Sequence, residues 1–83
     1  MGRPIRVTKA PEKTDIVEPR DLAAFVRARR TQAGLRIDDA AELCGVSVVT
    51  LSKIETAKGG VNVESLFKVL KGLGIQLRVK PWS

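Results

Sequence analysis

A series of short helical segments, most of them closed by a glycine, constrains this chain more than any other feature. Between residues 20 and 74 the apolar residues recur every three or four positions, a spacing that places them on one face of a helix. Gly34, Gly45 and Gly74 follow three of these segments, and glycine is the residue most often found just after a helix end. We therefore predict an all-α fold with four to five helices.

The same spacing predicts where the helices lie. The first is expected over 20–33 and the second over 37–44. Ser47 has the side chain of an N-cap residue and precedes a third helix over 48–56. A fourth, capped by Asn62, is expected to end at Gly72 and Gly74. The expected buried residues are Leu22, Phe25 and Val26 in the first helix, Ala40, Ala41 and Cys44 in the second, Leu51 and Ile54 in the third, and Val63, Leu66, Phe67, Leu70 and Leu73 in the fourth.

The N-terminal segment follows a different pattern. Residues 1–19 hold three of the four prolines and show no helical period. We expect a flexible arm that ends where Pro19 opens the first helix. Because Ile5 and Val7 alternate with polar residues, a short edge strand is the alternative.

The C-terminal segment predicts a strand. Within residues 75–83, Ile75, Leu77 and Val79 alternate with polar residues. A lone strand leaves its backbone groups unpaired, and a chain of 83 residues has a marginal core. We therefore expect this segment to be a dimerisation strand and tail that pairs with its copy in a homodimer. Pairing with residues 4–8 of the arm is the alternative.

Composition excludes several classes of function. The chain has one cysteine and no histidine, so it lacks an internal disulfide and the commonest catalytic base and metal ligand. No signal peptide and no membrane span are apparent. We expect a cytoplasmic protein that is not an enzyme and needs no cofactor, metal or small-molecule ligand. The acidic residues near the start of the second helix, Asp38, Asp39 and Glu42, are better explained by the helix dipole than by a metal.

Net charge suggests the kind of partner. Fifteen Lys and Arg against nine Asp and Glu give a formal charge of +6. A basic domain of this size usually meets phosphate, in nucleic acid or on an anionic membrane. A basic surface that merely keeps the protein in solution would look the same. The arginines that fit either interpretation are Arg20, Arg27, Arg29 and Arg36.

The second and third helices form the most informative unit. A short helix, a tight turn and another helix make up a helix-turn-helix, whose second helix enters the major groove of DNA. Ala41 is small where the two helices cross, and Gly45 can take the left-handed conformation that the turn requires. The helix over 48–56 is expected to be anchored by Val46, Leu51 and Ile54, so that its other face remains exposed.

Three stretches of this region resemble a known family. The motifs Val26-Arg27-x-x-Arg30, Ala41-Glu42-Leu43-Cys44-Gly45-Val46-Ser47 and Thr50-Leu51-Ser52-Lys53-Ile54-Glu55 are similar to those of XRE (Cro/CI-type, phage-repressor) helix-turn-helix proteins over residues 20–73. The continuation Leu-Gly-Ile-Gln-Leu-Arg-Val is most similar to HipB-type antitoxins. The resemblance implies a homodimer that binds operator DNA, represses its own operon and binds a HipA-type kinase toxin.

The resemblance also implies which residues meet DNA. Those at matching or neighbouring positions are Arg27, Ile37, Ser47, Val48, Val49, Thr50, Ser52, Lys53 and Lys58. Ile37 stands where many members have a phosphate-binding Gln, and Ala57 stands where glycine is common. Val48 and Val49 replace polar base-reading residues and can contact only thymine methyl groups. Lys53 is best suited to read a base, because it can reach guanine O6 and N7.

Other residues have an expected role outside the DNA contact. Arg30 and Glu55 match positions that pair in the family, and we interpret them as a structural ion pair rather than two surface charges. Cys44 is expected to pack rather than react, since no histidine can activate it. Trp82 is either an anchor for the toxin or a residue that packs on its own dimer.

The leading hypothesis is therefore a dimeric DNA-binding repressor that serves as an antitoxin. A stand-alone XRE-type regulator is the first alternative. A protein-interaction module that has lost base reading, for which Val48 and Val49 argue, is the second.

Overall fold

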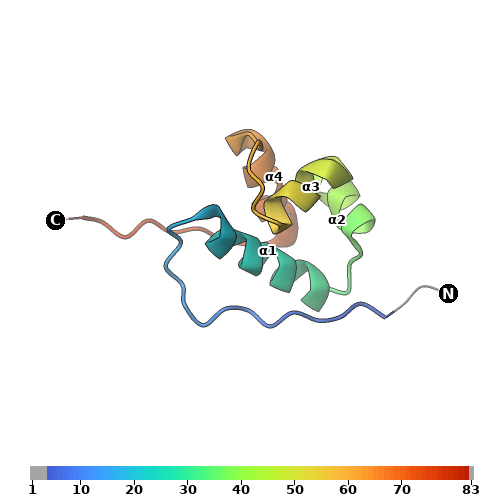
Figure 1. Cartoon of the computed structure of the whole chain (residues 1–83), viewed down its shortest axis with the longest axis horizontal. Helices are drawn as coiled ribbons and strands as arrows, with labels where there is room; N and C mark the ends of the chain where they lie inside the picture. Colours follow the sequence, from blue (N-terminus) through green and yellow to red (C-terminus); the bar gives the residue numbers. More distant parts are fainter. Residues whose placement is uncertain (1–3, 83) are drawn as a thin grey trace.

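The computed structural model describes residues 4–82 and contains four helices (Figure 1). They are α1 (Pro19–Gln32), α2 (Ile37–Cys44), α3 (Val48–Glu55) and α4 (Val63–Leu73). The predicted bounds of the first three differ from these by no more than one residue, and the all-α prediction is confirmed. No helix in the described part of the chain is long and apolar enough to cross a membrane.

The helices enclose one small apolar core. Val26, Leu51 and Val69, from α1, α3 and α4, have no solvent exposure and lie at its centre. The complete set of buried core residues is Leu22, Val26, Ala40, Ala41, Cys44, Leu51, Ile54, Val69, Leu70 and Leu73. Helices as short as α2 and α3 are unstable alone, so packing against this shared core holds them in place.

The buried face of α4 differs from the prediction. Val69, Leu70 and Leu73 are buried, whereas Val63 and Phe67 keep 65% and 53% of their surface exposed. The helix is apolar over more than one face, and its contacts with α1 and α2 select the face centred on Val69. Spacing along one helix does not say which part of a wide apolar stripe its neighbours will cover.

Gly72 lies inside α4 instead of ending it, so its predicted role is wrong. A Cβ atom at Gly72 would lie 2.5 Å from Cys44 Sγ and 3.0 Å from Cys44 Cα. The missing side chain therefore lets α4 approach the end of α2. The C-cap is Gly74, which has the left-handed φ of 72° that glycine adopts without strain.

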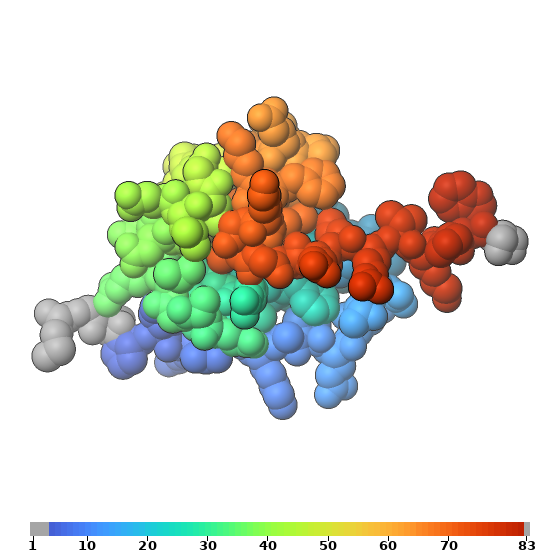
Figure 2. Space-filling view, turned by 180° about the vertical axis from the view of Figure 1, so that it is seen from behind, coloured from blue at the N-terminus to red at the C-terminus, as the bar shows by residue number. Residues whose placement is uncertain are grey.

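The predicted C-terminal strand is also wrong for the single chain. Residues 75–82 form no strand, because no neighbouring segment pairs with their backbone. Ile75 packs against the core, and its N–H donates to the carbonyl of Leu70 at 2.8 Å. Leu77 and Val79 are exposed, and the tail projects away from the helices (Figure 2).

The N-terminal arm lies along α1 and runs antiparallel to it (Figure 1). Within residues 4–18, neither Ile5 nor Val7 belongs to a strand, and Val7 is 64% exposed. The backbone N–H of Thr8 donates to Thr31 Oγ1 at 2.8 Å, and Gln32 Nε2 donates to the carbonyl of Thr8 at 3.0 Å. These two bonds attach the arm to the C-terminal end of α1.

Candidate nucleic-acid interface

The turn between α2 and α3 sets the direction of α3. Gly45 ends α2 with a φ of 74°, and the N–H of Val46 donates to the carbonyl of Ala41 at 3.0 Å. The Ser47 hydroxyl then accepts from the N–H of Thr50 at 3.0 Å, which caps the first turn of α3. A short turn held by these hydrogen bonds leaves α3 little freedom relative to α2.

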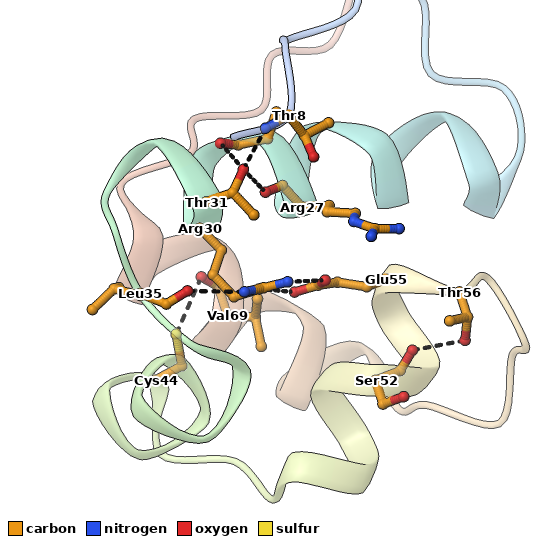
Figure 3. A network of polar contacts seen from close by, with 11 residues as sticks. Thr8, Arg27, Arg30, Thr31, Leu35, Cys44, Ser52, Glu55, Thr56 and Val69 are labelled. Atoms are coloured by element: carbon orange, nitrogen blue, oxygen red, sulfur yellow. Dashed lines mark hydrogen bonds and ion pairs between the residues drawn. The ribbon is translucent and has the colours of Figure 1, made fainter. Parts of the chain in front are cut away.

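A buried ion pair fixes the other end of α3. Arg30 on α1 donates from Nε to Glu55 Oε2 at 2.6 Å and from Nη2 to Oε1 at 2.9 Å. Its Nη1 donates to the carbonyl of Leu35 at 2.8 Å (Figure 3). The side chains of Arg30 and Glu55 are only 11% and 6% exposed. The two residues thus connect α1, the α1–α2 loop and α3 through a bidentate contact shielded from water.

The outer face of α3 is free of these contacts. Leu51 and Ile54 are buried, while Val48 and Val49 are 42% and 63% exposed. Thr50 and Ser52 are half-buried and Lys53 is exposed. The Thr50 hydroxyl accepts from Ser47 Oγ at 3.0 Å and keeps its own proton for another acceptor. This face therefore begins with two aliphatic side chains and ends with a lysine.

The loop after α3 adds a second cation. Lys53 Nζ lies beside Gly60, and the exposed Lys58 is held by a bond from its N–H to the carbonyl of Lys53 at 3.1 Å. Ala57 has a φ of 55°, in the region that favours glycine. The departure from glycine noted in the sequence therefore leaves the loop conformation in place but strained.

Two other predicted contact residues lie at the edge of this surface. Arg27 is exposed on α1, and its side chain extends on the side where Glu55 and Thr56 lie (Figure 3). Ile37, the first residue of α2, is half-buried and packs against the core. It has no polar group, so it can contact a DNA backbone only through its carbon atoms.

Cys44 is placed for packing. Its side chain is buried and its Sγ lies 3.7 Å from the carbonyl oxygen of Val69. Burial raises the pKa of this thiol, which favours the unreactive protonated form. Among residues 4–82, no three His, Cys, Asp or Glu side chains are grouped so that they could hold a metal ion.

Sequence reasoning assigned no role to Thr31 or Gln32, which attach the arm. Thr31 is 4% exposed, and its hydroxyl donates to a carbonyl of the preceding turn and accepts from Thr8. The spacing of apolar residues does not point to such a residue, because threonine is polar. The signal that could have found it is its spacing from Ala28, because a residue three positions later lies on the same side of a helix.

Comparison with known proteins places this geometry in a family. The Helix-turn-helix family model matches residues 26–80, more than half of the chain. The fold matches the structure titled "HipB-O4 20mer complex", with a TM-score of 0.73, 22% identity and coverage of 86% of this chain and 100% of that one.

Two further structures extend the comparison. HipB in the "HipA-HipB-O2-O3 complex" gives a TM-score of 0.74 at 22% identity, over 86% of this chain and 100% of that one. A hypothetical transcription factor from Neisseria gives a TM-score of 0.66 at 20% identity, over 83% and 82% of the two chains. No curated protein matches the chain. The chain belongs to the helix-turn-helix family of XRE type, and its fold is that of HipB antitoxin structures.

Proposed function

We propose that this protein is a homodimeric transcriptional repressor that binds operator DNA and acts as the antitoxin of a HipBA-like pair. The observation that carries the proposal is the geometry of α3. Its inner face is held by Leu51, Ile54 and the Glu55 ion pair, and its outer face is left open. A helix fixed in this way can enter the major groove without rearrangement. Such a repressor needs no catalytic group and no cofactor, and it works where its DNA lies, in the cytoplasm.

The side chains divide into two kinds of contact. Arg27 and Lys58 are exposed cations at the edges of the surface, suited to phosphates, and Ser47 lies at the α3 N-terminus, where backbone amides can also meet a phosphate. Val48 and Val49 would contact thymine methyl groups. Hydrogen-bond reading then rests on Thr50, Ser52 or Lys53, of which Lys53 has the reach for guanine.

Two lysine variants test this division. Lys58→Ala should weaken binding equally on promoter DNA and random DNA, and lower the salt slope by about one, because it removes one phosphate contact. Lys53→Ala should cost about 1–3 kcal/mol on promoter DNA alone. Fluorescence anisotropy on both duplexes over a range of salt concentrations measures both effects. Equal losses for Lys53→Ala on the two duplexes would make it a phosphate contact.

Dimerisation is assigned to the C-terminal tail. Leu77, Val79 and Trp82 are 45%, 82% and 88% exposed, and an extended segment has backbone groups ready to pair. If residues Ile75–Val79 paired with their copy in a two-stranded ribbon about a two-fold axis, the pairing would cover the exposed apolar side chains and bond the free backbone groups. Deletion of residues 75–83 should convert a dimer to a monomer in sedimentation. A dimer that survives the deletion would refute this assignment.

The second partner is a HipA-like kinase. Support comes from the fold shared with HipB, which is found with HipA in one of the matching structures. Trp82 is the proposed anchor, because an exposed aromatic side chain near a terminus is a frequent hot spot. Copurification of a kinase encoded beside this gene, with wild type and with Trp82→Ala, tests the contact. Equal recovery would mean that Trp82 serves another role, such as packing on its own dimer.

A second function is favoured by one observation. Val48 and Val49 are exposed where base-reading side chains would lie, and an aliphatic pair suits a protein surface as well as thymine. The alternative is a protein-interaction module that kept the fold. Wild-type protein that binds its own promoter no better than random DNA would favour this alternative. A repressor without a kinase partner would show the preference and copurify with no toxin.

A further inference from the structure

The N-terminal arm lies on α1 with a regular spacing. Ile5, Thr8 and Pro11 are half-buried, and the residues between them are exposed. A period of three is that of the extended polyproline II helix, and it turns one residue in three toward the surface beneath. Thr8 is the point of attachment, through its bonds to Thr31 and Gln32. The arm therefore has a defined register on α1, and Ile5 and Thr8 hold Arg6 between them.

That register brings Arg6 to a cleft beside the α3 surface. Residues from the arm, α1, the start of α2 and the end of α3 line this open cleft, which has a volume of about 420 Å³. Arg6, Arg27, Arg30 and Arg36 line it, together with a single acidic residue, Glu55. Arg30 already neutralises Glu55, so the lining of the cleft carries a net positive charge.

The position of the cleft beside α3 indicates which part of a DNA duplex its positive charge would contact. A helix in the major groove has a phosphate backbone on either side, since the groove is about 12 Å wide. The cleft holds the N-terminal end of α2 and hydroxyl groups of Ser52 and Thr56 at the side of α3. Helix N-termini and hydroxyls are common phosphate ligands in protein–DNA complexes. An arginine there would bind the backbone at the edge of a half-site.

We propose that the arm is a second DNA-binding element, in which the Thr8–Thr31 attachment presents Arg6 to the phosphate backbone flanking each half-site. The proposal rests on the proposed DNA-binding function and adds a contact outside the helix-turn-helix. Because Arg6 would bind phosphate, it would strengthen binding to any sequence and leave base preference unchanged.

Salt titration of Arg6→Ala tests the proposal, with Lys68→Ala as the control. Lys68 is an exposed cation on α4, outside the cleft, so both variants lose one positive charge. Arg6→Ala should lower the slope of log K against log salt by about 0.9 per chain, and weaken binding about fivefold to tenfold per chain at 0.1 M salt. The loss should be equal on promoter and random duplexes, and Lys68→Ala should bind nearly as wild type does.

A second variant tests the attachment itself. Thr31→Val keeps the shape and the charge of the protein but removes the hydroxyl that accepts from Thr8. It should show part of the Arg6→Ala loss while its far-UV circular dichroism stays that of wild type. Combined with Arg6→Ala it should add little, because both changes act on one contact.

The outcomes separate the two proposals. Wild-type protein that binds neither duplex at low salt would overturn the DNA-binding function and the arm contact together. If wild type binds and Arg6→Ala keeps the wild-type slope, only the arm contact is overturned. The same conclusion holds if Lys68→Ala loses as much as Arg6→Ala, since the effect would then be one of net charge.

Discussion

Replacing Glu55 with alanine should destabilise the fold far more than the loss of a surface charge does. The carboxylate accepts two charge-assisted hydrogen bonds from Arg30, and both side chains are nearly excluded from water. Without Glu55, the guanidinium stays in the same place with one bond, to the carbonyl of Leu35. Breaking a buried pair from one side costs about 3–5 kcal/mol. Because Arg30 keeps 11% exposure and that one bond, we expect a value near the lower end, about 3 kcal/mol.

Urea unfolding followed by circular dichroism measures this loss. For a small domain the free energy of unfolding changes by about 1 kcal/mol per molar urea, so the midpoint should fall by about 3 M. The matched control is Arg20→Ala. Arg20 forms an ion pair with Glu18 at 2.8 Å, a distance close to that of the buried pair, but the two side chains are 77% and 53% exposed. Removing a surface pair should cost no more than about 1 kcal/mol.

A double variant separates lost pairing from lost packing. Arg30→Met with Glu55→Leu replaces both charges with apolar groups and leaves no charge buried. It should recover much of the stability that Glu55→Ala loses, since buried pairs can often be exchanged for apolar ones. A surface pair typically contributes about 0.5 kcal/mol. If Glu55→Ala lowers the free energy of unfolding by less than this, the Arg30–Glu55 ion pair does not stabilise the fold, even though its atoms lie within bonding distance.

Four further changes have expected outcomes. Gly72→Ala should lower the urea midpoint by the equivalent of about 1–3 kcal/mol, because its Cβ would overlap Cys44 and force α4 away from α2; an unchanged midpoint would show that the helices separate freely. Ala57→Gly should raise the midpoint slightly, because it relieves the left-handed strain at φ 55°; a lower midpoint would contradict this. The Cys44 thiol, whose pKa is raised by burial, should react with iodoacetamide far more slowly in the folded protein than in urea, and equal rates would disprove its burial. Hydrogen bonds from the N–H groups of Val17 and Glu18 lower the pKa of Asp21, so the contribution of Asp21 to the free energy of unfolding is present above its unfolded pKa and is lost as the pH falls through its folded pKa. Asp21→Asn should therefore reduce the acid sensitivity of urea unfolding. An unaltered pH profile would show that other carboxylates control it.

Local features were predictable because they depend on a few neighbouring residues. Helix ends followed from Gly45, Ser47, Asn62 and Gly74, each of which acts on the backbone next to it. The helix-turn-helix followed from the small residue and the turn at fixed spacing. The resemblance to XRE proteins pointed to the family from sequence motifs alone.

Features that depend on contacts between distant segments were not predictable in this way. The spacing of apolar residues in α4 favours Phe67 over Val69 for the core, but the choice between them depends on where α1 and α2 lie. The close approach at Gly72 depends on Cys44, far away in the sequence. The alternating pattern in the tail does not produce a strand in a single chain, since a strand forms only when a second strand pairs with its backbone.

The candidate interface also has a part that was predictable from the sequence and a part that was not. The exposed face of α3 could be listed from the sequence because its opposite face is apolar at helical spacing. The cleft that holds Arg6 could not, because it joins four segments whose positions depend on the whole fold. The bonds that attach the arm involve Thr8 and Thr31, which carry no apolar signal.

The contact between Gly72 and Cys44 limits which substitutions proteins of this fold can tolerate at these two positions. The two positions share one small volume, so a methyl group gained at one must be given up at the other. Even an alanine at position 44 would leave its own Cβ 3.1 Å from a new Cβ at position 72, which is tighter than most atom pairs tolerate. Gly72 should therefore persist through changes at position 44 among small residues. A larger residue at position 72 should occur only in relatives whose α2 and α4 cross farther apart.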